Sequence, residues 1–154
     1  MRPHRYPTLT PAATSATGFL SNATGATWTL TTTTAADSLA HIVRITNDSA
    51  TDHSAKTAVL TGTDADGMAQ TETMNLPAAS TTSDSTKYFL TLTTIVPSAT
   101  IGSDTMDIGW TAVAVSSTFV PDYKQAPFNV SLGVDITGTI NYDLQHTFEE
   151  AKIK

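Results

Sequence analysis

The sequence predicts an all-β fold, and three observations support that prediction. Of the 154 residues, 31 are threonine, whose branched Cβ suits a pleated strand while its hydroxyl keeps the outer face wet. Short runs of β-branched, aliphatic and aromatic residues recur along the chain, separated by clusters of Asp, Asn, Gly, Ser and Pro. No window shows the i, i+3, i+4, i+7 spacing of an amphipathic helix. Short strands in this arrangement are typical of an Ig-like antiparallel β-sandwich.

Residues 1–12 are predicted to form an extended N-terminal arm. Pro3, Pro7 and Pro11 lack a backbone donor and restrict φ, which disfavours both a helix and an inner strand. Two alternatives remain open for this arm. It is either a loose terminus or a segment that lies along a neighbouring subunit, with Pro3, Tyr6 and Pro7 as its contact residues.

Residues 13–118 are predicted to form the sandwich itself. The segments with the strand pattern are Trp28–Leu30, His41–Thr46, Ala58–Thr61, Gln70–Leu76, Tyr88–Val96 and Thr105–Trp110. Each is β-branched or aromatic, and each is bounded by residues that favour turns.

Residues 119–127 are predicted to be a linker, and residues 128–154 a C-terminal β-hairpin. Two alternating runs flank the connection Thr137-Gly138-Thr139. Their apolar positions are Phe128, Val130, Leu132, Val134 and Ile136, then Ile140, Tyr142, Leu144, His146 and Phe148. A lone hairpin is marginal in water and an exposed apolar face of this size is rare. The hairpin is therefore expected to fold back on the sandwich, to pair with another chain, or to begin a second β-unit.

Composition disfavours several classes of function. The formal net charge is −6 and the sequence contains no cysteine, so disulfides and thiolate metal sites are excluded. An acidic chain without a basic run lacks the electrostatic footprint of a nucleic-acid-binding protein. No apolar stretch is long enough to span a membrane. We therefore expect neither a nucleic acid nor a membrane as a partner.

The sequence contains no convincing metal site. Asp64-Ala65-Asp66-Gly67 resembles the start of a calcium loop, but positions five and twelve of that pattern are Met68 and Asn75. The segment is better explained as a hairpin turn with an Asx hydrogen bond and a positive-φ glycine. None of the four histidines, His4, His41, His53 and His146, has zinc-binding spacing.

The sequence also contains no convincing catalytic constellation. Asp48, Asp52 and His53 are close in sequence, but no GxSxG nucleophile elbow accompanies them. The spaced acids Asp104, Asp107 and Asp135 cannot be placed in one cleft from sequence. The prediction is that the chain is not an enzyme and that it has no catalytic, cofactor-binding or metal-binding residues.

The aromatic residues permit a second class of function. Trp28 and Trp110, together with Tyr88 and Tyr123, have the chemistry of a sugar-stacking platform in a carbohydrate-binding or adhesin module. The ordinary alternative is that both tryptophans belong to the core of the sandwich. A host surface glycan is thus a conceivable partner, but not the favoured one.

Two parts of the sequence between residues 61 and 148 resemble a family of tailed-bacteriophage virion structural proteins. The first comprises Thr61–Gly67, Glu72–Pro77, Lys87–Phe89, Ile95, Pro97–Thr100 and Ile108–Trp110. The second comprises Pro127–Val134, Thr137–Tyr142 and Gln145–Phe148. These are degenerate strand patterns, so the resemblance implies a structural role and transfers no catalytic residue.

The resemblance implies a protein of the virion, favoured at the head surface, that acts as a capsid decoration or cement protein. A neck or tail adaptor, or another tail component, is the alternative within the same class. The expected partners are the major capsid protein or other virion proteins, and copies of the chain itself. The arm residues and the apolar hairpin positions named above form the predicted assembly interface.

Overall fold

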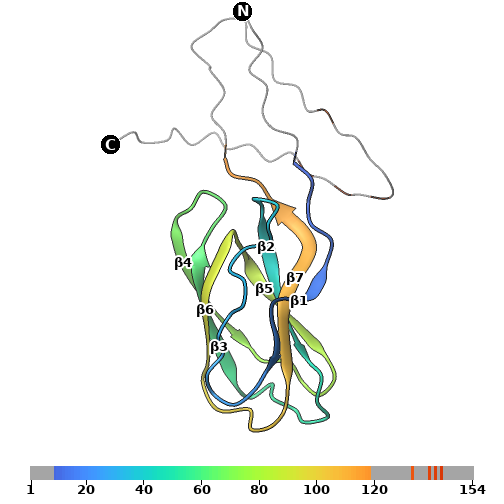
Figure 1. Ribbon diagram of the computed structural model, residues 1–154, viewed down its shortest axis with the longest axis vertical. Helices are drawn as coiled ribbons and strands as arrows, with labels where there is room; N and C mark the ends of the chain where they lie inside the picture. The colour runs from blue at the N-terminus through green and yellow to red at the C-terminus, as the bar shows by residue number, and fades with distance from the viewer. Residues whose placement is uncertain (1–8, 119–132, 134–138, 140, 142, 144–154) are drawn as a thin grey trace, which may run out of the picture. The chain divides into compact units, whose positions relative to one another are not determined.

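The computed structural model describes residues 9–118 and the isolated residues 133, 139, 141 and 143 (Figure 1). The chain divides into two units, Met1–Phe119 and Val120–Lys154, and the account below concerns the first. Its described residues form seven strands and no helix, as the sequence predicts. The strands are β1 (Ser15–Ala23), β2 (Ala40–Asn47), β3 (Thr57–Thr63), β4 (Ala69–Asn75), β5 (Thr82–Phe89), β6 (Thr91–Pro97) and β7 (Met106–Val115).

The strands form two antiparallel sheets. A four-stranded sheet has the order β1-β7-β2-β5, and a three-stranded sheet has the order β4-β3-β6. In a constant-type immunoglobulin domain, the first, second, fifth and fourth strands form one sheet. Here β4 lies in the smaller sheet, and β7 lies between β1 and β2 in the larger one. The protein therefore has the two-sheet architecture with its own strand order.

One apolar core lies between the sheets and draws on all seven strands. Its most deeply buried large side chains include Phe19, Val43, Ile45, Leu60, Phe89, Leu92, Ile95, Met106 and Ile108. Along β3 the buried Ala58 and Leu60 alternate with the outward Thr57, Val59 and Thr61. This period of two places one apolar face of each sheet against the other.

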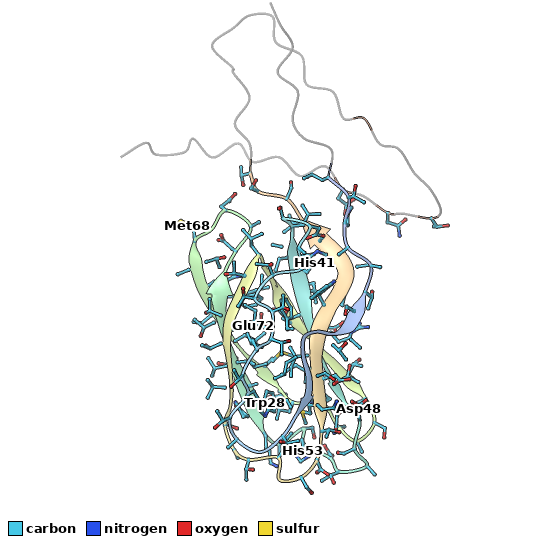
Figure 2. All side chains as sticks on the ribbon, viewed as in Figure 1. Trp28, His41, Asp48, His53, Met68 and Glu72 are labelled. Atoms are coloured by element: carbon cyan, nitrogen blue, oxygen red, sulfur yellow. The ribbon has the colours of Figure 1, made fainter. Side chains whose placement is uncertain are left out.

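Hydrogen bonds between the sheets partly close both lateral sides of the sandwich. On one side the segment after Trp28 bridges the sheets: Thr31 N donates to Phe19 O of β1, and Leu92 N of β6 donates to Thr33 O. On the other side, Glu72 of β4 accepts hydrogen bonds from Thr86 N and Lys87 N of β5, at 2.7 and 2.9 Å. Glu72 is labelled in Figure 2. These contacts cover strand edges that would otherwise be free to pair with another chain.

Three details differ from the sequence-based prediction. The expected strand Trp28–Leu30 is wrong, because Trp28 forms only an isolated bridge to Ile95. The expected strand Tyr88–Val96 is two strands, because the chain passes from one sheet to the other at Leu90. Strand β1 was not predicted at all. Its register shifts leave Phe19 and Leu20 both buried, so it lacks the alternation that identifies a strand.

Candidate functional site

All of the predicted assembly residues lie outside the described residues. This holds for the arm positions Pro3, Tyr6 and Pro7, and for the hairpin positions from Phe128 to Phe148 named above. Their predicted roles remain predictions. The candidate sites that the structure does describe are two histidine clusters, the points where the chain enters and leaves the sandwich, and an acidic pair.

The first cluster centres on His53, which is buried in the loop between β2 and β3 (Figure 2). Its Nε2 lies 2.9 Å from Asp104 Oδ2, and its Nδ1 lies 3.0 Å from Lys56 Nζ. Because an ammonium group can only donate, Nδ1 must accept and Nε2 must carry the hydrogen that Asp104 accepts. Lys56 Nζ also donates to Thr100 O at 2.8 Å.

This arrangement has the Asp–His half of a hydrolytic triad but lacks the nucleophile. The second ring nitrogen, which would activate a hydroxyl or thiol, faces a cation instead. The partner of His53 is Asp104, not the sequence neighbours Asp48 and Asp52. The cluster joins the loop before β3 to the loop before β7, so its role in the described structure is to fasten two loops together.

The second cluster centres on His41 in β2, which is fully buried (Figure 2). Its Nδ1 lies 2.9 Å from Thr111 O and its Nε2 lies 2.8 Å from Asp37 Oδ2. Both neighbours are acceptors, so both contacts are hydrogen bonds only when each ring nitrogen carries a hydrogen. The ring of His41 thus links β7 to the loop before β2.

Asp37 also holds the entering chain. The same Oδ2 accepts a hydrogen bond from Ala12 N at 2.7 Å, and Oδ1 accepts one from Leu39 N at 3.1 Å. Burial raises the pKa of Asp37, but the bonds from Ala12, His41 and Leu39 and the charge of His41 together outweigh it. The net pKa is therefore lowered from the ordinary value of 3.8.

The backbone on either side of Asp37 is strained. Ala36 and Ser38 have φ values of 64° and 63°, a region that residues other than glycine rarely occupy. Such strain costs about 1–3 kcal/mol per residue and persists only where the surroundings fix it. Here the surroundings are the bonds of Asp37 to three separate donors. The strained backbone at Ala36 and Ser38 therefore lowers stability while it fixes the position of the Asp37 carboxylate.

Further contacts fix the first described residues against β7. Trp110 Nε1 donates to Ala13 O at 3.0 Å, and Ala112 N donates to Thr14 Oγ1 at 3.0 Å. The Trp110 ring packs edge-on against Phe19, with 5.0 Å between the ring centroids. A Cβ at Gly18 would lie 2.0 Å from Trp110 Cζ3, so only glycine leaves room for the indole there.

A second aspartate forms hydrogen bonds with the chain just after β7, as Asp37 does with the chain just before β1. Asp66, in the turn between β3 and β4, accepts hydrogen bonds from Thr118 N and Thr118 Oγ1 at 2.6 and 2.9 Å. In the same turn, Asp64 Oδ1 accepts from Asp66 N and Met68 N, and Gly67 has a φ of 79°. The predicted Asx-type turn with a positive-φ glycine is confirmed.

The entry and exit points lie at the same end of the sandwich (Figure 1). A cavity of about 380 Å³ lies between them, and its wall includes Ala36 and Ser38 from the Asp37 loop, Ala65 from the β3–β4 turn, and Ser117. The residues that line it carry no charge. This end, where Asp37 holds Ala12 and Asp66 holds Thr118, is called the terminal end below.

The opposite end carries an acidic pair, Asp48 and Asp107. Burial, the Asp107 charge and a hydrogen bond between the two side chains raise the pKa of Asp48 above 3.8. Asp107 also accepts a hydrogen bond from Asn22 N at 2.8 Å. The described residues contain no group of three His, Asp or Glu side chains arranged to hold a metal ion.

The described aromatic residues do not form a sugar-stacking platform. Trp28 is 6% exposed and belongs to the core, as the ordinary interpretation predicts. Trp110 is partly buried against Gly18 and Phe19, and Tyr88 lies on β5 without another described aromatic ring paired with it. Tyr123 lies outside the described residues.

Comparison with known proteins adds no assignment: no protein-family model, no curated protein and no solved structure matches this chain. Within the part of the chain that the structure describes, no helix has the length and apolarity that crossing a membrane requires.

The Asp37 cluster was not found from the sequence. In the sequence His41 is an isolated histidine, and nothing marks Asp37 as its partner. The four-residue spacing of Asp37 and His41 is the available signal, but such spacing predicts a contact from sequence only where the segment is helical. Here the loop conformation at Ala36 and Ser38 brings them together instead.

Proposed function

We propose that the chain is a virion structural protein of a tailed bacteriophage, most specifically a capsid decoration protein. In this role the sandwich is the body, and the segments outside it attach that body to the major capsid protein and to other copies of the chain. The resemblance of residues 61–148 to phage virion proteins supports this assignment, as does the low content of charged residues, 14%.

The observation that carries the proposal is the terminal end. Ala12 and Thr118, near the two limits of the described sandwich, both lie there and are bonded to Asp37 and Asp66. Segments that emerge together can reach one underlying surface together, and two modest contacts to a lattice gain strength from each other. Attachment through these segments also suits a body whose lateral strand edges are largely closed.

The histidine clusters support a structural role over catalysis. His53 faces a cation in place of a nucleophile, and His41 is buried with two acceptors. Both join parts of the chain that are far apart in sequence.

The test uses particles of a mutant virus from whose genome the gene for the chain has been deleted. Purified full-length chain is added, and bound protein is quantified relative to the major capsid protein. A decoration protein saturates in proportion to the capsid subunits, whereas a neck or tail adaptor saturates at one or a few rings. Absence of binding to heads and tails alike contradicts the virion assignment.

A matched variant addresses the attachment mechanism. Deletion of residues 119–154 leaves the sandwich, and it is expected to abolish saturation binding while the circular dichroism of the β-fold is kept. Undiminished binding of the truncated chain contradicts attachment through the C-terminal segment. A glycan array probed with the same full-length chain examines the adhesin alternative.

A further inference from the structure

The outer face of the three-stranded sheet differs in its lack of charge from the outer face of the four-stranded sheet. Its outward positions are Thr57, Val59, Thr61 and Thr63 on β3, Ala69, Thr71, Thr73 and Asn75 on β4, and Thr91, Thr94 and Val96 on β6. None of these residues is charged. We call this surface the threonine face.

The centre of the threonine face is an exposed apolar pair. Val59 and Val96 lie opposite each other on adjacent strands, and they are 40% and 55% exposed. Opposed side chains on neighbouring antiparallel strands are about 4.5–5.5 Å apart at Cβ, so the two valines form one continuous patch. The hydroxyls around them are partly satisfied within the sheet: Thr63 and Thr91 are 2.8 Å apart at Oγ1, and Thr93 Oγ1 donates to Thr61 O.

The charges of the described residues are elsewhere. Residues 9–118 contain nine Asp or Glu side chains but only three Lys or Arg side chains. The outer face of the four-stranded sheet carries Arg44, Asp84 and Asp107, of which the first two form an ion pair at 2.7 Å. Contact between two copies through most surfaces would therefore bring carboxylates together, at a cost in free energy. The threonine face is where two copies can meet without that repulsion.

The strand edges offer no easier route to self-association. The segment 28–33 bridges β1 and β6, and Glu72 bonds to the edge of β5. Gln70 also donates to Tyr88 O, and Lys87 Nζ donates to Thr71 O across the same gap. These contacts occupy parts of the strand edges and so disfavour edge-to-edge pairing, whereas stacking of sheet faces stays open to the sandwich.

We propose that the threonine face is a self-association surface that binds the threonine face of a second copy, with Val59 and Val96 at the centre. Contact of one patch with the same patch on a partner gives a two-fold symmetric pair. This proposal concerns the sandwich alone and does not depend on a virion role, so the two can fail separately.

The area indicates a weak contact. A seven-residue strand is about 24 Å long and three strands are about 14 Å across, giving about 340 Å² per copy. Stable complexes bury about 800 Å² per partner. The pair is therefore expected to form at high concentration in free solution, and to matter where copies are held close together.

The experiment is a dilution series of the full-length chain followed by ¹H–¹⁵N NMR, from about 20 µM to about 1 mM. Concentration-dependent shifts are expected at Val59, Thr73, Thr94 and Val96. Absence of shifts up to the highest concentration overturns the proposal. Shifts at this face and equally at a second, separate surface also overturn it, because they indicate a head-to-tail contact.

Matched variants make the assignment specific. Val96→Glu places a carboxylate in the patch and is expected to weaken association at least about tenfold. Val113→Glu is the control, because Val113 on β7 is 54% exposed and the substitution changes net charge equally. Equal effects of the two variants contradict the proposal.

The absence of cysteine allows a covalent readout. Val59→Cys, treated with a short bis-maleimide, is expected to give a covalent dimer, whereas Val113→Cys stays a monomer. Equal dimer yields from the two variants overturn the assignment of the face. Circular dichroism of each variant establishes that the fold is retained.

Discussion

Replacing Asp37 with Asn tests whether the buried carboxylate fastens the entering chain to the sandwich. The carboxylate accepts three hydrogen bonds, from Ala12 N, His41 Nε2 and Leu39 N, and its side chain is 9% exposed. Breaking a buried ion pair by removing one partner costs about 3–5 kcal/mol. Asn keeps one acceptor oxygen, so we expect a loss of about 3 kcal/mol at pH 7.

The pH dependence follows from the direction of the pKa shift. The pKa of Asp37 is lower in the folded protein than its unfolded value of 3.8. A lowered carboxyl pKa contributes stability above the unfolded pKa, and that contribution is lost as the pH falls through the folded pKa. The difference in unfolding free energy between wild type and Asp37→Asn should therefore be large at pH 7 and shrink below pH 3.8.

The assay is urea unfolding at a series of pH values, followed by tryptophan fluorescence and far-UV circular dichroism. Asp84→Asn is the control, because Asp84 pairs with Arg44 while 40% exposed. Exposed pairs contribute about 0.2–1 kcal/mol. The reasoning is refuted if Asp37→Asn is no more destabilising than this control, or if its effect is the same at pH 7 and at low pH.

Three further predictions concern other described residues. Asp48→Asn should raise the urea midpoint at pH 7 and not at pH 3. Burial and the Asp107 charge raise the pKa of Asp48 in the folded protein. The ionised form of Asp48 therefore destabilises the fold above the unfolded pKa, and Asn removes that charge. Asp52→Asn should lower the urea midpoint at pH 7, since hydrogen bonds from Ser54 lower the pKa of Asp52. If both variants shift the midpoint in the same direction, the opposite pKa shifts of Asp48 and Asp52 are contradicted. Gly18→Ala should cost about 1–3 kcal/mol because its Cβ meets the Trp110 ring, and unchanged urea unfolding relative to wild type would show that the indole can move aside.

The strands with regular alternation were predictable from sequence. Met74 alternates with polar neighbours in β4, and in β3 the small or aliphatic Ala58 and Leu60 occupy every second position of a β-branched run. The Asx-type turn at Asp64 was predictable too, because its hydrogen bonds are local. Strand β1 was not predicted, since its register shifts bury two consecutive residues, Phe19 and Leu20.

The candidate site was less predictable than the fold. The Asp37 cluster depends on Ala12, 25 residues away, and on Thr111, which is 70 residues from His41. The partner of His53 is Asp104, 51 residues distant, whereas the sequence drew attention to the adjacent Asp52. The sequence identifies donors and acceptors, but which of them meet is decided by packing between sheets. The predicted assembly residues stay predictions, because they lie outside the described residues.

The neighbouring positions of β1 and β7 determine how the sandwich responds to force. The two strands are adjacent and antiparallel, so the start of β1 and the end of β7 lie together at the terminal end. A force that spreads the two exits apart loads this ladder from one end, and its hydrogen bonds break one after another, as in a zipper. A force that lifts the body while both exits are held loads the two strands in parallel. We therefore expect the sandwich to resist lifting better than spreading, with the hydrogen bonds of Asp37 to Ala12 and of Asp66 to Thr118 lying where the load enters.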